Sequence, residues 1–174
     1  MNVPRFKQKR INMCGLTALR MTLAYFGEDI QEKELSKLTG GIKKYGLKTI
    51  KLADAAEKLG FEIECLSYNK KLAFNRAKIK KPNIDDILKY LNKKVPVIVA
   101  VRSSLLYDEK STKAGHFIVI SKWKSGFFYY NDPTDGKSHK IKEEALRFAW
   151  LNNVLNSSAY LLVIWPKKFL RVTG

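Results

Sequence analysis

The stretch QKRINMCGLTALRMTLAYFG occupies residues 8–27 and places a cysteine, Cys14, directly before a segment with helical periodicity. Apolar residues recur on one helical face from Met13 to Phe26, and Gly27 is a typical helix terminator, so the spacing predicts a helix over 13–26. A helix N-terminus offers unpaired N–H groups and a partial positive charge, which stabilise a thiolate. Cys14 is therefore a candidate nucleophile, although a free cysteine before an apolar helix is more often a buried structural residue.

Length and composition indicate one globular domain over residues 1–174, because the chain has 174 residues of which 45% are hydrophobic. The longest apolar runs, VIVAV (97–101) and LLVIW (161–165), are too short for a membrane span and have the β-branched content of buried strands. The basic amino terminus has no apolar core after it, and the two cysteines lie far apart. These features favour free thiols in a reducing compartment, and we expect a cytoplasmic protein.

The chain is strongly basic, with a formal net charge of +17. Such an excess can indicate a nucleic-acid partner or an anionic membrane surface. Its lysines are scattered along the chain, and the densest basic run, RAKIKK (76–81), has no interleaved aromatic residues that could stack on bases. The distribution favours a lysine-rich solvated surface over a nucleic-acid site, although charge alone leaves that site open.

Periodicity and turn residues predict the remaining elements. Helices are predicted over 32–38, 49–59, 84–94 and 140–152, and strands over 61–68, 96–102, 116–123, 127–132 and 158–165, with a polar loop over 103–114. The strand over 61–68 shows the alternation of a half-buried strand. Helices dominate the first half and strands the second, which predicts an α+β fold with a helical N-terminal half packed on an antiparallel β-sheet.

Two histidines could serve as a catalytic base. His116 opens an apolar strand, whereas His139 lies in the polar segment GKSHKIK, which is typical of a solvated loop. A hairpin turn centred on Ser125 would pair residues whose numbers sum to about 250. His116 and Asp132 would then be diagonal neighbours on one face, where the carboxylate can orient the imidazole. A register shift of one residue would place them on opposite faces.

An acyl-transfer site also needs donors for an oxyanion. The backbone N–H of Cys14 and the side-chain amide of Gln8 are the candidates, although Gln8 taken alone is typical of an exposed glutamine. Gly15 would leave room for a substrate backbone, and Cys65 is expected in the core. No His or Cys cluster has zinc spacing and no glycine-rich phosphate loop follows a strand, so neither a metal nor another cofactor is indicated.

Four motifs together resemble the C39 family of papain-like cysteine peptidases. They are Gln-x5-Cys-Gly (8–15), a helix ending in Tyr-Phe-Gly (25–27), Gly-His-Phe-Ile-Val-Ile (115–120) and Tyr-Asn-Asp-Pro (130–133). The layout of residues 29–68 is also similar, so the resemblance covers about residues 1–135 closely and the rest loosely. In that family the domain is often the cytosolic front end of bacteriocin-exporting ABC transporters, and it cleaves leader peptides after a double glycine.

The resemblance implies a papain-like fold and a role for each candidate residue. Cys14 would be the nucleophile, His116 the general base, Asp132 the residue that orients the base, and Gln8 the oxyanion donor. The implied substrate is a peptide or protein, with an acidic leader as one form of it. A separate transporter partner is a further expectation, because these residues include no transporter. Met13 departs from the family pattern, which commonly has an acidic or small residue before the cysteine.

Two other functions stay open at this stage. A thiol site of this kind could transfer an acyl group to an amine or act on a non-peptide amide, because the catalytic residues do not dictate the acceptor. The chain could also be a catalytically silent basic module that binds an anionic partner. The double glycine at 40–41 resembles the end of a cleavable leader, but it is better explained as a helix stop.

Overall fold

The computed structural model describes residues 1–107 and 115–169. The described helices are α1 (Cys14–Tyr25), α2 (Glu32–Leu38), α3 (Thr49–Lys58), α4 (Lys70–Ala73), α5 (Ile84–Asn92), α6 (Ser103–Leu106) and α7 (Glu143–Leu151), with 3₁₀ turns η1 (Ile11–Met13) and η2 (Val154–Asn156). The described strands are β1 (Phe61–Ser67), β2 (Lys78–Ile79), β3 (Val97–Arg102), β4 (Gly115–Lys124), β5 (Phe127–Asp132), β6 (Lys137–Lys142) and β7 (Leu161–Pro166).

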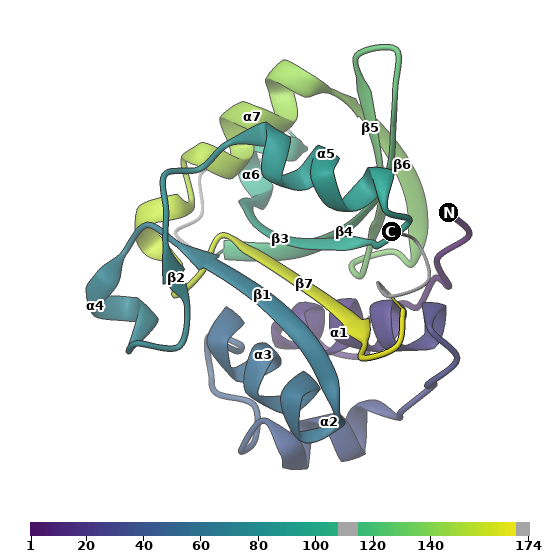
Figure 1. Cartoon of the computed structure of the whole chain (residues 1–174), viewed down its shortest axis with the longest axis vertical. Coiled ribbons are helices and arrows are strands. Elements are labelled where there is room, and N and C mark those ends of the chain that lie inside the picture. Colours follow the sequence, from purple (N-terminus) through teal and green to yellow (C-terminus); the bar gives the residue numbers. More distant parts are fainter. Residues whose placement is uncertain (108–114, 170–174) are drawn as a thin grey trace.

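The strands form one sheet in the order β2-β1-β7-β3-β4-β5-β6 (Figure 1). Neighbouring strands are antiparallel throughout, apart from the short pair of β1 and β2 at one edge, which is parallel. The predicted α+β fold with an antiparallel sheet is therefore confirmed, and the parallel edge pair is the one departure from it.

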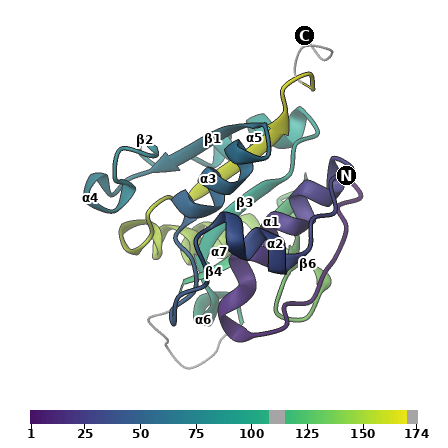
Figure 2. The same ribbon diagram turned by 90° about the horizontal axis from the view of Figure 1, so that it is seen from below.

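Helices cover both faces of this sheet. In Figure 1, α1, α2 and α3 lie below the sheet while α5, α6 and α7 lie above it, and Figure 2 shows the first three helices from below. The strand β4 divides its side chains between two cores, since Phe117 and Val119 belong to the core under α1 and α3, and Ile118 and Ile120 to the core under α5 and α7. The helical N-terminal half packs on the sheet as predicted, but it covers only one face.

The burial of both faces of the sheet under helices also explains the apolar runs in β3 and β7. A strand that is buried on both faces needs apolar residues at every position. All five residues of the run at 97–101 are buried, and so are four of the five at 161–165. In β1 the predicted alternation fails for the same reason, because Cys65, Leu66 and Ser67 are buried in succession.

The approach of α1 to β4 depends on a glycine. A Cβ atom on Gly15 would lie 3.2 Å from the ring of Phe117 and 3.3 Å from the side chain of Leu52. The absence of a side chain at Gly15 lets the first turn of α1 settle against β4 next to His116. The structure thus gives Gly15 a packing role, where the sequence suggested room for a substrate backbone.

The hairpin of β4 and β5 has the predicted pairing of residues, but its turn differs from the predicted one and a β-bulge corrects the register. Its loop is Ser125-Gly126, with φ of 52° and 79°, and Lys124 pairs with Phe127, so the turn lies half a residue beyond the predicted centre. A register shift between Ile120 and Lys122, a β-bulge, compensates for that difference. Ile120 therefore pairs with Tyr130 as predicted.

Other boundaries differ from the predictions. The predicted helix over 140–152 begins only at Glu143, because residues 137–142 form β6 and pair with β5. The predicted loop over 103–114 contains the helix α6, and its residues 108–114 lie outside the described part of the chain. The strand predicted over 158–165 runs from Leu161 to Pro166, and α4 and β2 were not predicted at all.

Candidate active site

Cys14 is the first residue of α1 and follows the 3₁₀ turn η1. The first turn of this helix contains no acidic residue, so the partial positive charge of the helix N-terminus acts on Cys14 without a competing carboxylate. The side chain is buried, with 8% of the residue exposed, yet it lines a cleft. The helix therefore holds the thiol at a surface that a substrate can reach.

His116 and Asp132 come together at neighbouring strand ends. His116 is the second residue of β4, and Asp132 is the last residue of β5. The imidazole Nε2 lies 2.9 Å from the Asp132 Oδ1, and both residues are buried. The structure thus brings this pair of predicted site residues into direct hydrogen-bond contact.

Burial and hydrogen bonding compete at His116. Burial disfavours the charged imidazole, but hydrogen bonds with Asp132 and Cys14 outweigh it and raise the pKa of His116 to about 10. Burial likewise disfavours the Asp132 carboxylate, whereas His116 and the further donors Tyr107 and Thr134 favour it and lower its pKa to about 2. Near neutral pH the two side chains form an imidazolium–carboxylate pair.

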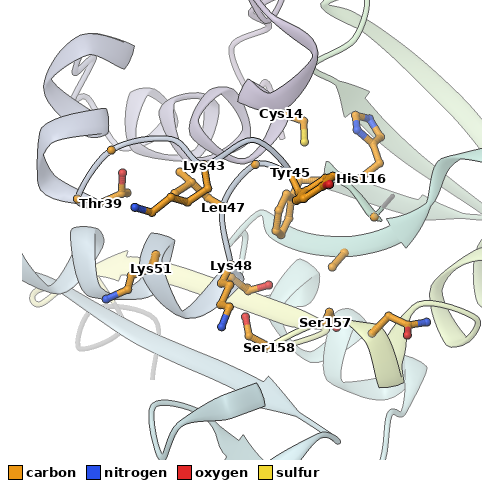
Figure 3. Close-up of a pocket in the computed structure, with 18 residues that line it drawn as sticks. Cys14, Thr39, Lys43, Tyr45, Leu47, Lys48, Lys51, His116, Ser157 and Ser158 are labelled. Carbon is orange, nitrogen blue, oxygen red and sulfur yellow. The ribbon is translucent and has the colours of Figure 1, made fainter. Parts of the chain in front are cut away.

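The contact between Cys14 and His116 completes a row of three groups. A hydrogen bond with Cys14 is among the causes of the raised pKa of His116. Because Nε2 is held by Asp132, the other ring nitrogen, Nδ1, is left for the Cys14 sulfur. Figure 3 shows the two side chains beside one another at one side of the cleft.

A backbone hydrogen bond fixes the position of Gln8 near the end of β5. Its N–H donates to the carbonyl of Pro133 over 2.7 Å, which ties the N-terminal lead-in to the turn after Asp132. Its side-chain oxygen is buried and has no partner among the described residues. Gln8 is not among the described residues that line the cleft. The structure therefore ties the Gln8 backbone to Pro133, the residue that follows Asp132.

His139 is not the solvated loop residue that the sequence suggested. It lies on β6, half-buried, with Nε2 3.0 Å from a carboxylate oxygen of Asp135. Its ring stacks on Tyr130 with 5.4 Å between ring centroids. It does not line the cleft that Cys14 and His116 share. Within the described structure His139 is therefore a packed residue that is hydrogen-bonded to Asp135.

Sequence reasoning missed two donors to Asp132. The backbone N–H of Thr134 donates to Oδ1 over 2.6 Å, a turn that the sequence Asp-Pro-Thr could have indicated. The hydroxyl of Tyr107 donates to Oδ2. Tyr107 lies in the segment predicted as a loop, and no pattern in the sequence links it to Asp132.

The cleft beside Cys14 and His116 has a volume of about 710 Å³, within the usual size for a ligand site. Much of its wall comes from the segment 39–48, which joins α2 to α3, and Ser157 and Ser158 lie on the side away from Cys14 (Figure 3). Three lysines line it, Lys43, Lys48 and Lys51, and no acidic residue does so among the described residues. The cleft is therefore basic.

Within residues 1–107 and 115–169, no three His, Cys, Asp or Glu side chains are grouped so that they could hold a metal ion. In the same part of the chain, no helix has the length and apolar character needed to cross a membrane.

Comparisons with known proteins agree with this architecture. The model of the Peptidase_C39 like family matches residues 1–157. A comparison with curated proteins gives no match.

Solved structures show the same fold. The peptidase domain of Streptococcus ComA, a bifunctional ABC transporter involved in quorum sensing, superposes with a TM-score of 0.67 at 18% identity, covering 95% of this chain and 100% of that one. A protein from Bacillus anthracis described as a C39-like peptidase has a TM-score of 0.67 at 16% identity, with 95% and 96% covered. A double-glycine motif protease from an AMS/PCAT transporter, solved with its leader peptide, has a TM-score of 0.59 at 20% identity, with 95% and 93% covered.

At these identities the structural likeness shows the fold, and it confirms the predicted papain-like architecture. The family match extends over most of the chain and supports a cysteine peptidase function. The chain belongs to the Peptidase_C39 like family.

Proposed function

We propose that this chain is a cysteine peptidase that hydrolyses peptide bonds through Cys14, His116 and Asp132. One observation carries the proposal: Cys14 and His116 open onto the same cleft, and Asp132 holds the His116 imidazole over 2.9 Å. A nucleophile, a base and a group that orients the base are the parts that acyl transfer requires. Membership of the family supports the same reaction class.

The proposed reaction has two steps. The Cys14 thiolate attacks the scissile carbonyl carbon and forms a C–S bond, while the carbonyl oxygen becomes an oxyanion. The C–N bond then breaks, and the His116 imidazolium gives its proton to the departing amine. In the second step His116 takes a proton from water, the resulting hydroxide attacks the thioester, and the C–S bond breaks. Cys14 leaves as a thiolate beside a protonated His116, which is the state in which the first step began.

Gln8 and the backbone N–H of Cys14 are the proposed oxyanion donors. The bond from the Gln8 backbone to Pro133 supports this role, because it fixes the lead-in next to the residues that hold His116.

The proposed substrate is a peptide with acidic side chains near the cleaved bond. The support is the charge of the cleft, whose described lining includes Lys43, Lys48 and Lys51 and no acidic residue; Lys51 pairs with Asp54, which lies outside the lining, over 3.5 Å. A double-glycine leader fits the family to which the chain belongs, and one structural relative was solved with such a leader. We further propose that residues 1–174 work as one domain in the cytoplasm, and that a separate transporter exports the product.

The test is hydrolysis of a peptide library by the purified chain, followed by mass spectrometry. The wild type should cleave a subset of acidic peptides, and Cys14→Ala should abolish cleavage while the matched variant Cys65→Ala keeps it. The proposal fails if the cleavage pattern is the same in wild type and Cys14→Ala. Added amines distinguish the alternatives, because a transferase would give amide products in place of the free carboxylate. Unchanged peptides together with salt-dependent binding of an anionic partner would favour the silent basic module.

A further inference from the structure

Three donors hold the Asp132 carboxylate, which is fully buried. Its Oδ1 accepts from Nε2 of His116 and from the backbone N–H of Thr134, and its Oδ2 accepts from the hydroxyl of Tyr107. Among the described residues, Tyr107 is the partner that the structure gives to Oδ2. A buried carboxylate oxygen without a donor is costly, so the Tyr107 hydroxyl satisfies a need that no other described residue meets.

Tyr107 is itself fixed by its surroundings. It follows α6, and its backbone N–H donates to the carbonyl of Ser103 over 3.1 Å. The hydroxyl of Tyr130 donates to the hydroxyl of Tyr107 over 3.3 Å. Tyr130 is buried on β5 two residues before Asp132, so both side chains lie on one face of that strand. The hydrogen bonds thus form a chain in which Tyr130 donates to Tyr107 and Tyr107 donates to Asp132.

The phenol of Tyr107 stays protonated near neutral pH and can therefore donate a hydrogen bond, because its pKa is raised. Burial is the largest cause that raises the pKa of Tyr107, and its hydrogen bond to Asp132 raises that pKa further. The outer torsion of an aspartate side chain is soft, so a carboxylate held by one oxygen can rotate. A donor on Oδ2 removes that freedom and keeps Oδ1 facing the imidazole.

We propose that Tyr107 is a positioning residue of this site: its hydroxyl fixes the Asp132 carboxylate so that Oδ1 holds Nε2 of His116 and leaves Nδ1 for Cys14. Tyr107 is not among the described residues that line the cleft, so it acts through Asp132 and not on the substrate. The effect of Tyr107 on hydrolysis rests on the proposed function, in which His116 is the catalytic base, whereas its effect on the position of Asp132 does not.

The first test needs no substrate. Tyr107→Phe keeps the ring and removes the hydroxyl, and the imidazole of His116 is followed by NMR as the pH is raised. Because the Asp132 bond raises the pKa of His116, loosening that bond should lower this pKa from about 10 by about one unit. The matched control is Tyr90→Phe, which removes a phenol that donates to another carboxylate, Glu64, away from the site. That control should leave the titration of His116 unchanged.

The second test uses hydrolysis. Tyr107→Phe should lower kcat about tenfold with little change in KM, because a hydrogen bond to a charged group is lost and the cleft is untouched. In an Asp132→Asn background the same change should have little further effect, since Tyr107 acts through Asp132. A purely structural role would instead lower the Tm and leave the kcat of the folded enzyme unchanged. The loss of Tm would then be the same with Asp132 and with Asn at position 132.

The outcomes separate the two proposals. If His116 titrates as in wild type in the folded Tyr107→Phe variant, the positioning role of Tyr107 is overturned, whatever the peptidase activity. If the titration shifts but the wild type cleaves no peptide, Tyr107 still positions Asp132, and it is the proposed function that fails.

Discussion

The Oδ1 atom of Asp132 lies 2.9 Å from Nε2 of His116, at the ends of two strands that pair with one another. This contact fixes which ring nitrogen is left for the thiol and favours the protonated imidazole. Hydrolysis by a site of this kind requires both effects, because the imidazole must point at the sulfur and carry the proton that the leaving amine receives.

Asp132→Asn should therefore lower kcat by about a hundredfold or more, with KM little changed, because the amide no longer stabilises the imidazolium. The measurement is steady-state hydrolysis of a cleaved peptide. A matched control is Asp135→Asn, since Asp135 pairs with the other histidine, His139, and should matter little. Equal losses in the two variants would contradict a specific role for Asp132.

Alkylation by iodoacetamide should distinguish the two cysteines at neutral pH. Burial, and after it the charge of Asp54, raises the pKa of Cys65 to about 12, so Cys65 stays an unreactive thiol. Cys14 lies at a helix N-terminus and lines the same cleft as His116. We expect modification of Cys14 alone, identified by peptide mass mapping.

The same experiment in His116→Ala should slow the modification of Cys14 about tenfold or more at pH 6, because the imidazolium no longer stabilises the thiolate. The rate at Cys65 serves as the internal control for unfolding. An unchanged rate at Cys14 would remove the main support for an activated nucleophile.

The hairpin shows both the reach and the limit of sequence reasoning. Apolar alternation and the signal Lys124-Ser125-Gly126 were enough to predict that His116 and Asp132 share a face. The exact turn and the bulge between Ile120 and Lys122 could not be read from the sequence, and their effects on register cancel. The predicted proximity of His116 and Asp132 is therefore confirmed, although the turn was predicted half a residue from its actual position.

Other features had no local signal. The strand β6 carries three lysines, Lys137, Lys140 and Lys142, and little apolar surface, so its pairing with β5 is decided by tertiary context. Tyr107 reaches Asp132 across a separation of 25 residues, and nothing in the composition of its segment indicates that contact. The second helical layer was missed for a similar reason, because a pattern along one helix does not say which face of a sheet it will cover.

Stability should depend on pH through the same ion pair. The pKa of His116 is about 10 in the folded chain against 6.5 for an ordinary histidine, so its contribution is complete below about pH 6.5 and is lost as pH rises through 10. Asp132 has a pKa of about 2 against 3.8, so its contribution is complete above about pH 4 and is lost as pH falls through 2. The pair therefore stabilises the fold most between these limits.

The corresponding measurement is the free energy of unfolding in urea at pH 7 and pH 10. It should fall between these values in wild type and fall less in His116→Gln, which cannot hold the proton. The lysines titrate in both proteins and cancel in the comparison. Parallel declines would show that His116 does not gain its proton on folding.

Gly15→Ala should destabilise the protein by about 1–3 kcal/mol, the usual cost of overpacking. The better helix propensity of alanine offsets about 1 kcal/mol at most, whereas the new methyl group meets the buried Phe117 and Leu52. Because Phe117 adjoins His116, kcat should fall as well. Adding Phe117→Leu makes room for the methyl group and should recover part of both losses, and additive losses in thermal unfolding would contradict this packing account.

The basic cleft gives the last prediction. Lys43 and Lys48 line it without an acidic neighbour among the described lining residues, so reversing both charges should repel an acidic peptide. In the double variant Lys43→Glu/Lys48→Glu, KM for an acidic substrate should rise by roughly fivefold or more at low salt, with kcat nearly unchanged. The matched control reverses Lys122 and Lys124, which are exposed on β4 and do not line the cleft, so the net charge changes equally. Added salt should reduce the difference between the two variants, because exposed charges are screened. If both variants raise KM alike, the total charge of the chain steers the substrate, and the cleft lysines have no special part in recognising it.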